Sequence, residues 1–138
     1  MKFLLPTLLF LVSASLQAAD VEVTVDGVTE TRGTMMIGFY TNPQDFRVNE
    51  IPQSPKFLVT KAGRITAVAR DLKPGIYAVG VVWDVNNNGI LDTKGRFKIP
   101  TEPYGFSNNP KARFGPPSFD QCLIQVPENG ARIHIFLK

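Results

Sequence analysis

Alternating apolar and polar residues predict most of the secondary structure of this chain. Val21, Val23 and Val25 alternate with polar residues, which is the pattern of a half-buried β-strand, and Asp26-Gly27 predicts a turn at its end. Short apolar runs of the same kind predict six further strands, at residues 35–39, 57–60, 65–69, 76–83, 122–126 and 133–137. Asn42-Pro43 has the residues of a helix start, so we expect one helical turn over 42–46 and a loop over 47–56.

The run from Ile76 to Trp83 is apolar on both faces, which predicts a strand at the centre of a sheet. Pro74-Gly75 precedes it and has the residues of a type II turn. Tyr77 follows that turn by two residues, and we expect its hydroxyl to bond back to the turn's backbone, as in a tyrosine corner.

Seven short strands with glycine and proline turns, no long helix and no internal repeat predict an all-β fold. We expect a single antiparallel β-sandwich of about seven strands, immunoglobulin-like or transthyretin-like, with one long irregular loop. A small β-barrel is the alternative.

Residues 93–117 form the predicted long loop, because five prolines interrupt them. Its aromatic residues argue against disorder. Binding-loop candidates are the residues Tyr104, Phe106, Asn108, Asn109 and Phe114. The cations of this segment, interleaved with aromatic residues, are a pattern that also binds nucleic acid or anionic sugars. We expect instead that the aromatic residues pin the loop to the sandwich and that the cations stay solvated.

The start of the chain has the pattern of a signal peptide. Met1-Lys2 is positive, residues 3–12 are almost wholly apolar, and residues 16–18 (LQA) resemble a peptidase site. We expect a signal peptide at 1–19, a single domain at 20–138 and a bacterial periplasmic or secreted location; a retained anchor is the alternative. No later segment predicts a transmembrane span.

Composition limits the remaining function classes. Cys122 is the only cysteine, so the exported domain is expected to fold without an intrachain disulfide. Loss of Lys2 with the leader lowers the net charge of +3 by one. So small an excess does not predict a nucleic-acid partner.

The segment from Asp84 to Asp92 (DVNNNGILD) carries the clearest chemistry. Asp84, Asn86 and Asn88 alternate, a glycine follows, and the Ile90 carbonyl and Asp92 fall where a calcium loop places further oxygen ligands. The usual final glutamate is missing, because Gly95 stands at its position; Glu102 or Asp120 is a possible additional ligand. With two formal carboxylates, we expect a structural calcium site with a Kd on the order of 10⁻⁴ to 10⁻³ M. A metal-free turn rich in Asp and Asn is the alternative.

The residues give little support for catalysis. His134 is expected to be an exposed strand residue, and Cys122 a buried small hydrophobe. Ser107 has no evident base beside it. Asp84 and Asp92 have the chemistry of a glycosidase acid–base pair, so a carbohydrate-active enzyme of the cell envelope remains the alternative to a binding or structural module.

Four motifs occur together in a known order: residues 72–79 (LKPGIYAV), 84–92 (DVNNNGILD), 104–109 (YGFSNN) and 115–120 (GPPSFD). This order resembles the bacterial exported family catalogued as domain of unknown function 2141. The resemblance covers most of the chain and implies a compact exported β domain; it implies no catalytic residues. The expected function is therefore an exported non-enzymatic module with a calcium loop, and residues 93–117 would contact an envelope protein or a glycan.

Overall fold

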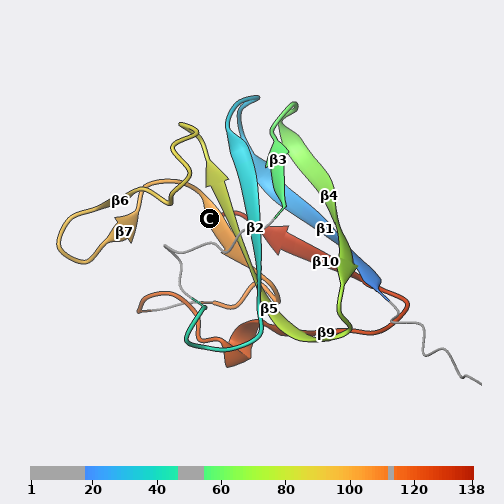
Figure 1. Cartoon of the computed structure of the whole chain (residues 1–138). Helices are drawn as coiled ribbons and strands as arrows, with labels where there is room; N and C mark the ends of the chain where they lie inside the picture. The colour runs from blue at the N-terminus through green and yellow to red at the C-terminus, as the bar shows by residue number, and fades with distance from the viewer. Residues whose placement is uncertain (1–17, 47–54, 112–113) are drawn as a thin grey trace, which may run out of the picture.

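The computed structural model describes residues 18–46, 55–111 and 114–138 of the chain (Figure 1). Its elements are β1 (Ala19–Val28), β2 (Thr34–Tyr40), β3 (Lys56–Leu58), β4 (Gly63–Leu72), β5 (Gly75–Asp84), β6 (Thr93–Lys94), β7 (Ile99–Pro100), β8 (Tyr104–Phe106), the 3₁₀ turn η1 (Asp120–Cys122), β9 (Leu123–Val126) and β10 (Ala131–Phe136). The predicted all-β fold is confirmed.

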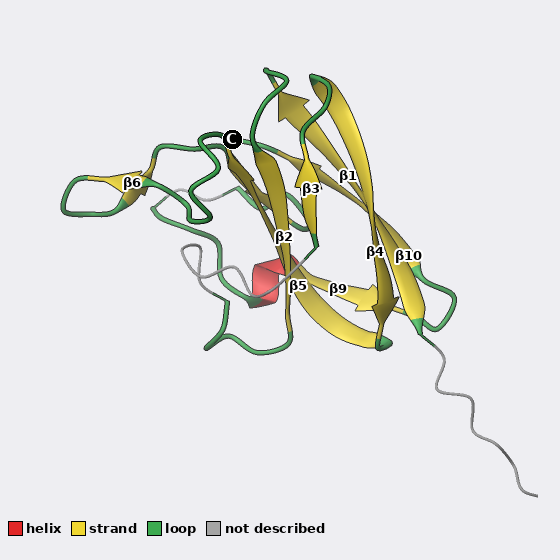
Figure 2. Cartoon of the chain, turned by 45° about the horizontal axis from the view of Figure 1, so that its top comes forward, coloured by secondary structure: helices red, strands yellow, loops and turns green. Residues whose placement is uncertain are grey.

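Two sheets build the sandwich, as Figure 2 shows. The first has the strand order β10-β1-β4, and the second has the order β3-β2-β5. β8 and β9 share the far edge of β5: β8 pairs with Gly80–Val82, and β9 pairs with Gly75–Ala78. The long strand β5 is therefore central, as its apolar character predicted.

The core lies between the two sheets. From the first sheet come the alternating valines Val21, Val23 and Val25, which are fully buried. Side chains of β2, β4, β5, β9 and β10 also belong to this cluster, among them Met35, Ile37, Ala67, Ala69, Val79, Val81, Trp83, Val126 and Ile135. The burial of apolar surface, which contributes about 25 cal/mol of free energy per Å², is the main force that holds the sheets together.

The outer face of the second sheet is also covered. Tyr40, Ala78, Phe106 and Cys122 form a second buried cluster there, with Phe46, Tyr104, Phe119 and Leu123 packed against it. Met36, Val82 and Leu91 form a third. These clusters explain why β5 is apolar on both faces, although a strand of a β-sandwich usually has one solvent-exposed face.

One local prediction is confirmed, and a second is confirmed only in part. The Tyr77 hydroxyl donates a hydrogen bond of 2.5 Å to the Lys73 carbonyl, which closes the tyrosine corner over the Pro74-Gly75 turn. The Asn42 side chain accepts from the Asp45 amide at 2.9 Å, which caps a single turn as expected, although no helix forms. The predicted loop at 47–56 falls mainly outside the described residues.

Other predictions require correction. β10 pairs with β1 in parallel, so the sandwich is not purely antiparallel. β1 does not end at Asp26-Gly27 but continues to Val28, since a shift in register lets Gly27 adopt φ 101° within the strand. Cys122 belongs to η1 and the outer cluster, whereas Ile124 and Val126 face the central core, so these three side chains do not share one face.

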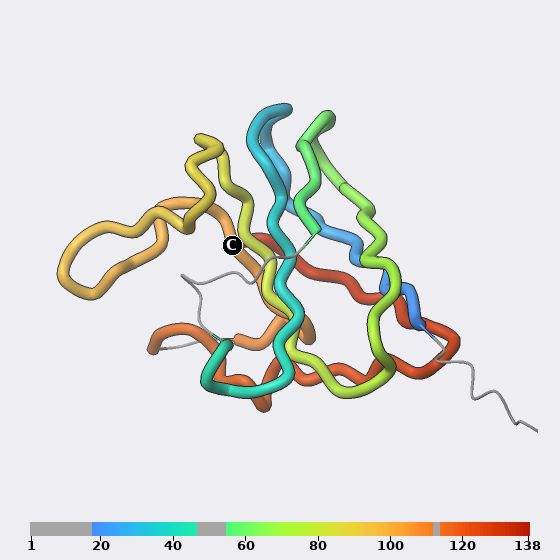
Figure 3. The backbone as a smooth tube through the Cα atoms, viewed as in Figure 1, coloured from blue at the N-terminus to red at the C-terminus, as the bar shows by residue number. Residues whose placement is uncertain are grey.

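Residues 93–117 are not one irregular loop, as the sequence suggested. Residues 93–100 make the β6–β7 hairpin, and Tyr104–Phe106 is strand β8 of the second sheet. Figure 3 shows the hairpin leaving the body of the sandwich, followed by the return to the sheet. The prolines do not prevent this arrangement: Pro100 is the last residue of β7 and Pro103 directly precedes β8, where a missing amide donor is tolerated, and the other three lie outside the strands.

The predicted signal peptide at 1–19 lies outside the described residues except for its last two, and it stays a prediction. None of the helical segments in the described part of the chain has the length and apolarity needed to span a bilayer.

Candidate metal centre

The candidate calcium loop starts at the buried end of β5. The Asp84 side chain is 2% exposed, and its carboxylate accepts hydrogen bonds from the amides of Asn88 (3.1 Å) and Gly89 (2.7 Å). Gly89 has φ 83°, a left-handed angle that glycine adopts without a steric penalty. Asp84 therefore folds the following five residues back over the end of its own strand.

The two asparagines of the motif form further turns on the same loop. Asn86 Oδ1 accepts from the Asn88 amide at 3.2 Å, and Asn88 Oδ1 accepts from the Ile90 amide at 3.2 Å. Such bonds explain the alternate spacing of the short polar residues, since an Asn side chain reaches the backbone two residues on. Each of these oxygens has a second lone pair for another partner.

Three predicted ligands converge at one point. Asn86 Nδ2 donates to Asp92 Oδ2 at 2.7 Å, and Asn88 Nδ2 donates to both Asp92 oxygens at 2.8 and 2.9 Å. The side chains at positions three, five and nine of the motif are thus brought together. The carbonyl of Ile90 belongs to the same turn, and the Ile90 side chain is 56% exposed.

Glu102 anchors both ends of the loop. Its carboxylate is 8% exposed and accepts from the Val85 amide at 3.0 Å and from the Asp92 amide at 2.9 Å. The Asp92 carbonyl in turn accepts from the Thr101 amide at 2.8 Å. The sequence named Glu102 as a possible extra ligand; the structure gives it the role of a brace. Asp120 lies in η1, on the turn before β9.

Within the described residues, no group of three His, Cys, Asp or Glu side chains is arranged to hold a metal ion. The ligands predicted from the sequence include two asparagine side chains and one backbone carbonyl, and these are not among the side chains of such a group. Their chemistry fits calcium, because this ion takes carboxylate, amide and backbone oxygens together.

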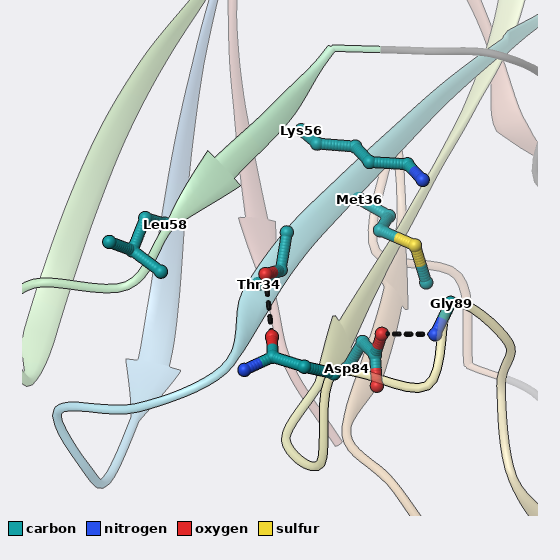
Figure 4. A pocket seen from close by; sticks show the side chains of 7 residues that line it. Thr34, Met36, Lys56, Leu58, Asp84 and Gly89 are labelled. Atoms are coloured by element: carbon teal, nitrogen blue, oxygen red, sulfur yellow. Dashed lines mark hydrogen bonds between the residues drawn. The ribbon is translucent and has the colours of Figure 1, made fainter.

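A pocket of about 280 Å³ adjoins the loop (Figure 4). It lies over the β3-β2-β5 part of the second sheet and is lined by Thr34, Met36, Lys56, Leu58, Asp84, Asn87 and Gly89. The Thr34 hydroxyl donates to Asn87 Oδ1 at 2.7 Å, so Asn87 points away from its neighbours in the motif and toward β2. This bond ties the loop to a second strand.

The binding-loop candidates do not form one exposed surface. Phe106 is 8% exposed in the outer cluster, and Tyr104 packs against it. Asn108 Nδ2 donates to the Leu123 carbonyl of β9, while Asn109 exchanges two bonds with the backbone of β10. These two asparagines bridge the edges of the sheets. Phe114 alone of the five is fully exposed.

Ser107, Cys122 and His134, the residues considered for catalysis, make contacts that support the fold. The Ser107 hydroxyl is buried and accepts from the Val79 amide at 2.9 Å. Cys122 is fully buried, and burial raises the pKa of its thiol to about 11. His134 is exposed and contacts the Asp26 carboxylate. Two hydrogen bonds of 3.0 Å from the Arg64 guanidinium, with His134 beside them, hold the pKa of Asp26 below its usual value.

A family model described as an uncharacterized protein conserved in bacteria (DUF2141) matches residues 23–134. The chain belongs to this family. The match extends from β1 to β10, so the Asp84–Asp92 loop, the β6–β7 hairpin and the asparagine bridges are all parts of the DUF2141 region. The family resemblance predicted from the four sequence motifs is thereby confirmed. No curated protein and no solved structure matches the chain.

Proposed function

We propose that this DUF2141 protein is an exported, non-enzymatic module of the bacterial envelope whose Asp84–Asp92 loop takes a structural calcium ion. Asp84, Asn86, Asn88, the Ile90 carbonyl and Asp92 would hold the ion. A bound ion would add positive charge among carboxylate and amide oxygens and so stabilise the loop. Export is supported by the leader-like start of the chain, and the bacterial setting by the family description.

The observation that carries the metal proposal is the meeting of Asn86 and Asn88 on the carboxylate of Asp92. Hydrogen bonds from the two amide groups hold these three side chains at one point, so the candidate ligands at positions three, five and nine are close together before an ion binds. Because both present nitrogen to Asp92, ion binding requires that each amide turn its oxygen toward the same point.

Glu102 supports a structural role for the ion. Its carboxylate accepts hydrogen bonds from the amides of Val85 and Asp92, so the two ends of the loop are already fixed before any ligand binds. A pre-formed loop loses less conformational entropy on binding. The loop leads directly into the β6–β7 hairpin, so an ion at Asp92 would stiffen the base of that hairpin.

Thermal unfolding with and without calcium tests the proposal. We expect the Tm to rise in calcium and to return in excess EDTA; at ten times Kd the gain in unfolding free energy is about 1.4 kcal/mol. Asp92→Asn should remove most of this rise. Asp84→Ala should abolish it too, but it should also lower the Tm in EDTA, because it frees the amides of Asn88 and Gly89. A Tm that ignores both calcium and EDTA contradicts the proposal.

A further inference from the structure

The β6–β7 hairpin projects from the sandwich as an arm, here defined as residues 93–100 (Figures 1 and 3). Thr93 pairs with Pro100 and Lys94 with Ile99, and the Lys98 amide donates to the Gly95 carbonyl at 3.2 Å to close the tip. The tip therefore has a defined backbone shape.

Large apolar side chains on the arm are left in solvent. Phe97 is 86% exposed and Ile99 is 53% exposed, and neither belongs to a core cluster. The expectation that aromatic residues pin residues 93–117 to the sandwich holds for Tyr104 and Phe106, but it is wrong for Phe97 and Phe114. Two large apolar side chains exposed together at the end of a projecting hairpin are the kind of surface that marks an interaction site.

The same tip is strongly positive. Lys94, Arg96 and Lys98 alternate with the glycine and the phenylalanine, and all three are exposed. No acidic residue stands between Thr93 and Thr101, and none of the three cations forms an ion pair with another residue in the described part of the chain. Their charge is therefore free for an external anion.

The base of the arm, by contrast, is held firmly. Leu91 is 4% exposed in a buried cluster with Met36 and Val82. The Asp92 carbonyl accepts from Thr101, and Glu102 accepts from the Asp92 amide. A rigid base below a projecting tip presents the exposed side chains at a constant angle.

From this arrangement we propose that the arm docks on the surface of an anionic phospholipid bilayer. Lys94, Arg96 and Lys98 would contact lipid phosphates, and Phe97 and Ile99 would enter the interfacial region between the headgroups. Phenylalanine, like tryptophan and leucine, is typical of segments that bury their apolar side chains at the headgroup boundary, and cations near an anionic leaflet are attracted to it. Both features are needed for stable attachment, since a single weak signal gives only marginal binding.

A soluble polyanion fits the arm less well. Phosphate or sulfate groups of a nucleic acid or glycan would use the three cations, but a single phenylalanine between them offers one stacking surface and no groove. The aliphatic Ile99 has no use in stacking on bases or sugars. A bilayer uses the cations, the aromatic ring and the aliphatic side chain together. This proposal does not depend on calcium.

Vesicle flotation of the protein purified after export tests the arm, in EDTA so that the metal proposal is not involved. We compare vesicles of equal phosphatidylglycerol and phosphatidylcholine with vesicles of phosphatidylcholine alone. The triple variant Lys94→Gln, Arg96→Gln, Lys98→Gln should lose on the order of a hundredfold in partitioning, at about fivefold per cation. The matched control is Lys56→Gln, Lys61→Gln, Lys73→Gln, which makes the same change in net charge at exposed sites away from the tip.

A second pair of variants tests insertion. Phe97→Ala should reduce partitioning by roughly tenfold at constant charge, whereas Leu58→Ala, which removes another exposed apolar side chain (71% exposed), should have little effect. Phe97→Trp gives a direct signal, because the only native tryptophan, Trp83, is buried and supplies a constant background. Its emission should shift to the blue on anionic vesicles.

The proposal is overturned if the two triple variants bind alike, or if the Phe97→Trp emission is unchanged on vesicles. It is also overturned if heparin or duplex DNA binds as tightly as the vesicles and Phe97→Ala leaves all binding unaffected, which would make the arm a general polyanion site. Because all variants share one N-terminus, any leader residues that persist cannot produce the difference between them.

Discussion

Asn88→Asp separates a calcium loop from a metal-free turn more sharply than a deletion of ligands. In the absence of metal, Asn88 donates to both oxygens of Asp92. The aspartate removes these bonds and places a second negative charge beside the first. Since both side chains are partly in solvent, we expect a loss of about 1–2 kcal/mol in unfolding free energy in EDTA.

Calcium should offset most of this loss. A third carboxylate raises the affinity of an oxygen site for calcium. If Kd falls about tenfold, from about 1 mM to about 0.1 mM, then about 10 mM calcium stabilises the native chain by about 1.4 kcal/mol and the variant by about 2.7 kcal/mol. At roughly 3–6 °C per kcal/mol for a domain of this size, the Tm rise caused by calcium should be visibly larger in the variant.

The adjacent residue provides a matched control. Asn87→Asp makes the same charge change one position away, but the Asn87 side chain faces Thr34, whose hydroxyl can donate equally well to a carboxylate. Its Tm rise in calcium should equal that of the native chain. Differential scanning fluorimetry in EDTA, calcium and magnesium gives all the required values. Equal responses of the Asn88 and Asn87 variants, or no response in any of them, would show that Asn88 is not part of a calcium site.

Three further predictions concern the fold. Tyr77→Phe removes the hydroxyl that donates to the Lys73 carbonyl and should cost about 0.5–1.5 kcal/mol by urea unfolding; an unchanged midpoint would exclude the corner as a stabilising element. Gly105→Ala places a Cβ 2.7 Å from a backbone carbonyl of β10 and should cost about 1–3 kcal/mol, whereas Gly80→Ala, with its nearest neighbour at 3.5 Å, should be mild; equal costs would contradict the packing. Burial raises the pKa of the Cys122 thiol to about 11, so this thiol should resist a disulfide reagent at pH 8 until the protein unfolds; rapid labelling of the native protein would disprove its burial. The free energy of unfolding should also fall as the pH rises above about 9, because the unfolded chain loses the thiol proton at a lower pH than the folded chain does.

The parts of the fold that sequence predicts are those with long patterns or specific turn chemistry. Val21, Val23 and Val25 supply enough alternation to place a strand and its buried face. Tyr77 is placed by the proline-glycine turn before it. The central position of β5 follows from apolar residues on both faces.

The missed parts are short or depend on distant partners. β6, β7 and β8 have two or three residues each, which is too few for alternation to be recognised. Nothing local distinguishes a parallel from an antiparallel neighbour, so the pairing of β10 with β1 appears only in the assembled sheet. Tyr104 and Phe106 are therefore strand residues where the prolines around them suggested a loop.

For the candidate site, the spacing of the motif correctly places Asn86, Asn88 and Asp92 together, because an Asx-rich turn is a local structure. The brace by Glu102 is a longer contact, ten residues from Asp92, and spacing alone cannot assign its role. The exposure of Phe97 was also beyond prediction, since an aromatic residue in a proline-rich segment is as compatible with packing as with projection.

A crystal structure grown in millimolar calcium decides whether the Asp84–Asp92 loop is a metal site. We predict an ion there with oxygens of Asp84, Asn86, Asn88, Ile90 and Asp92 at about 2.3–2.6 Å. A loop that holds no ion, with the amide nitrogens of Asn86 and Asn88 still donating to Asp92, would contradict a calcium site.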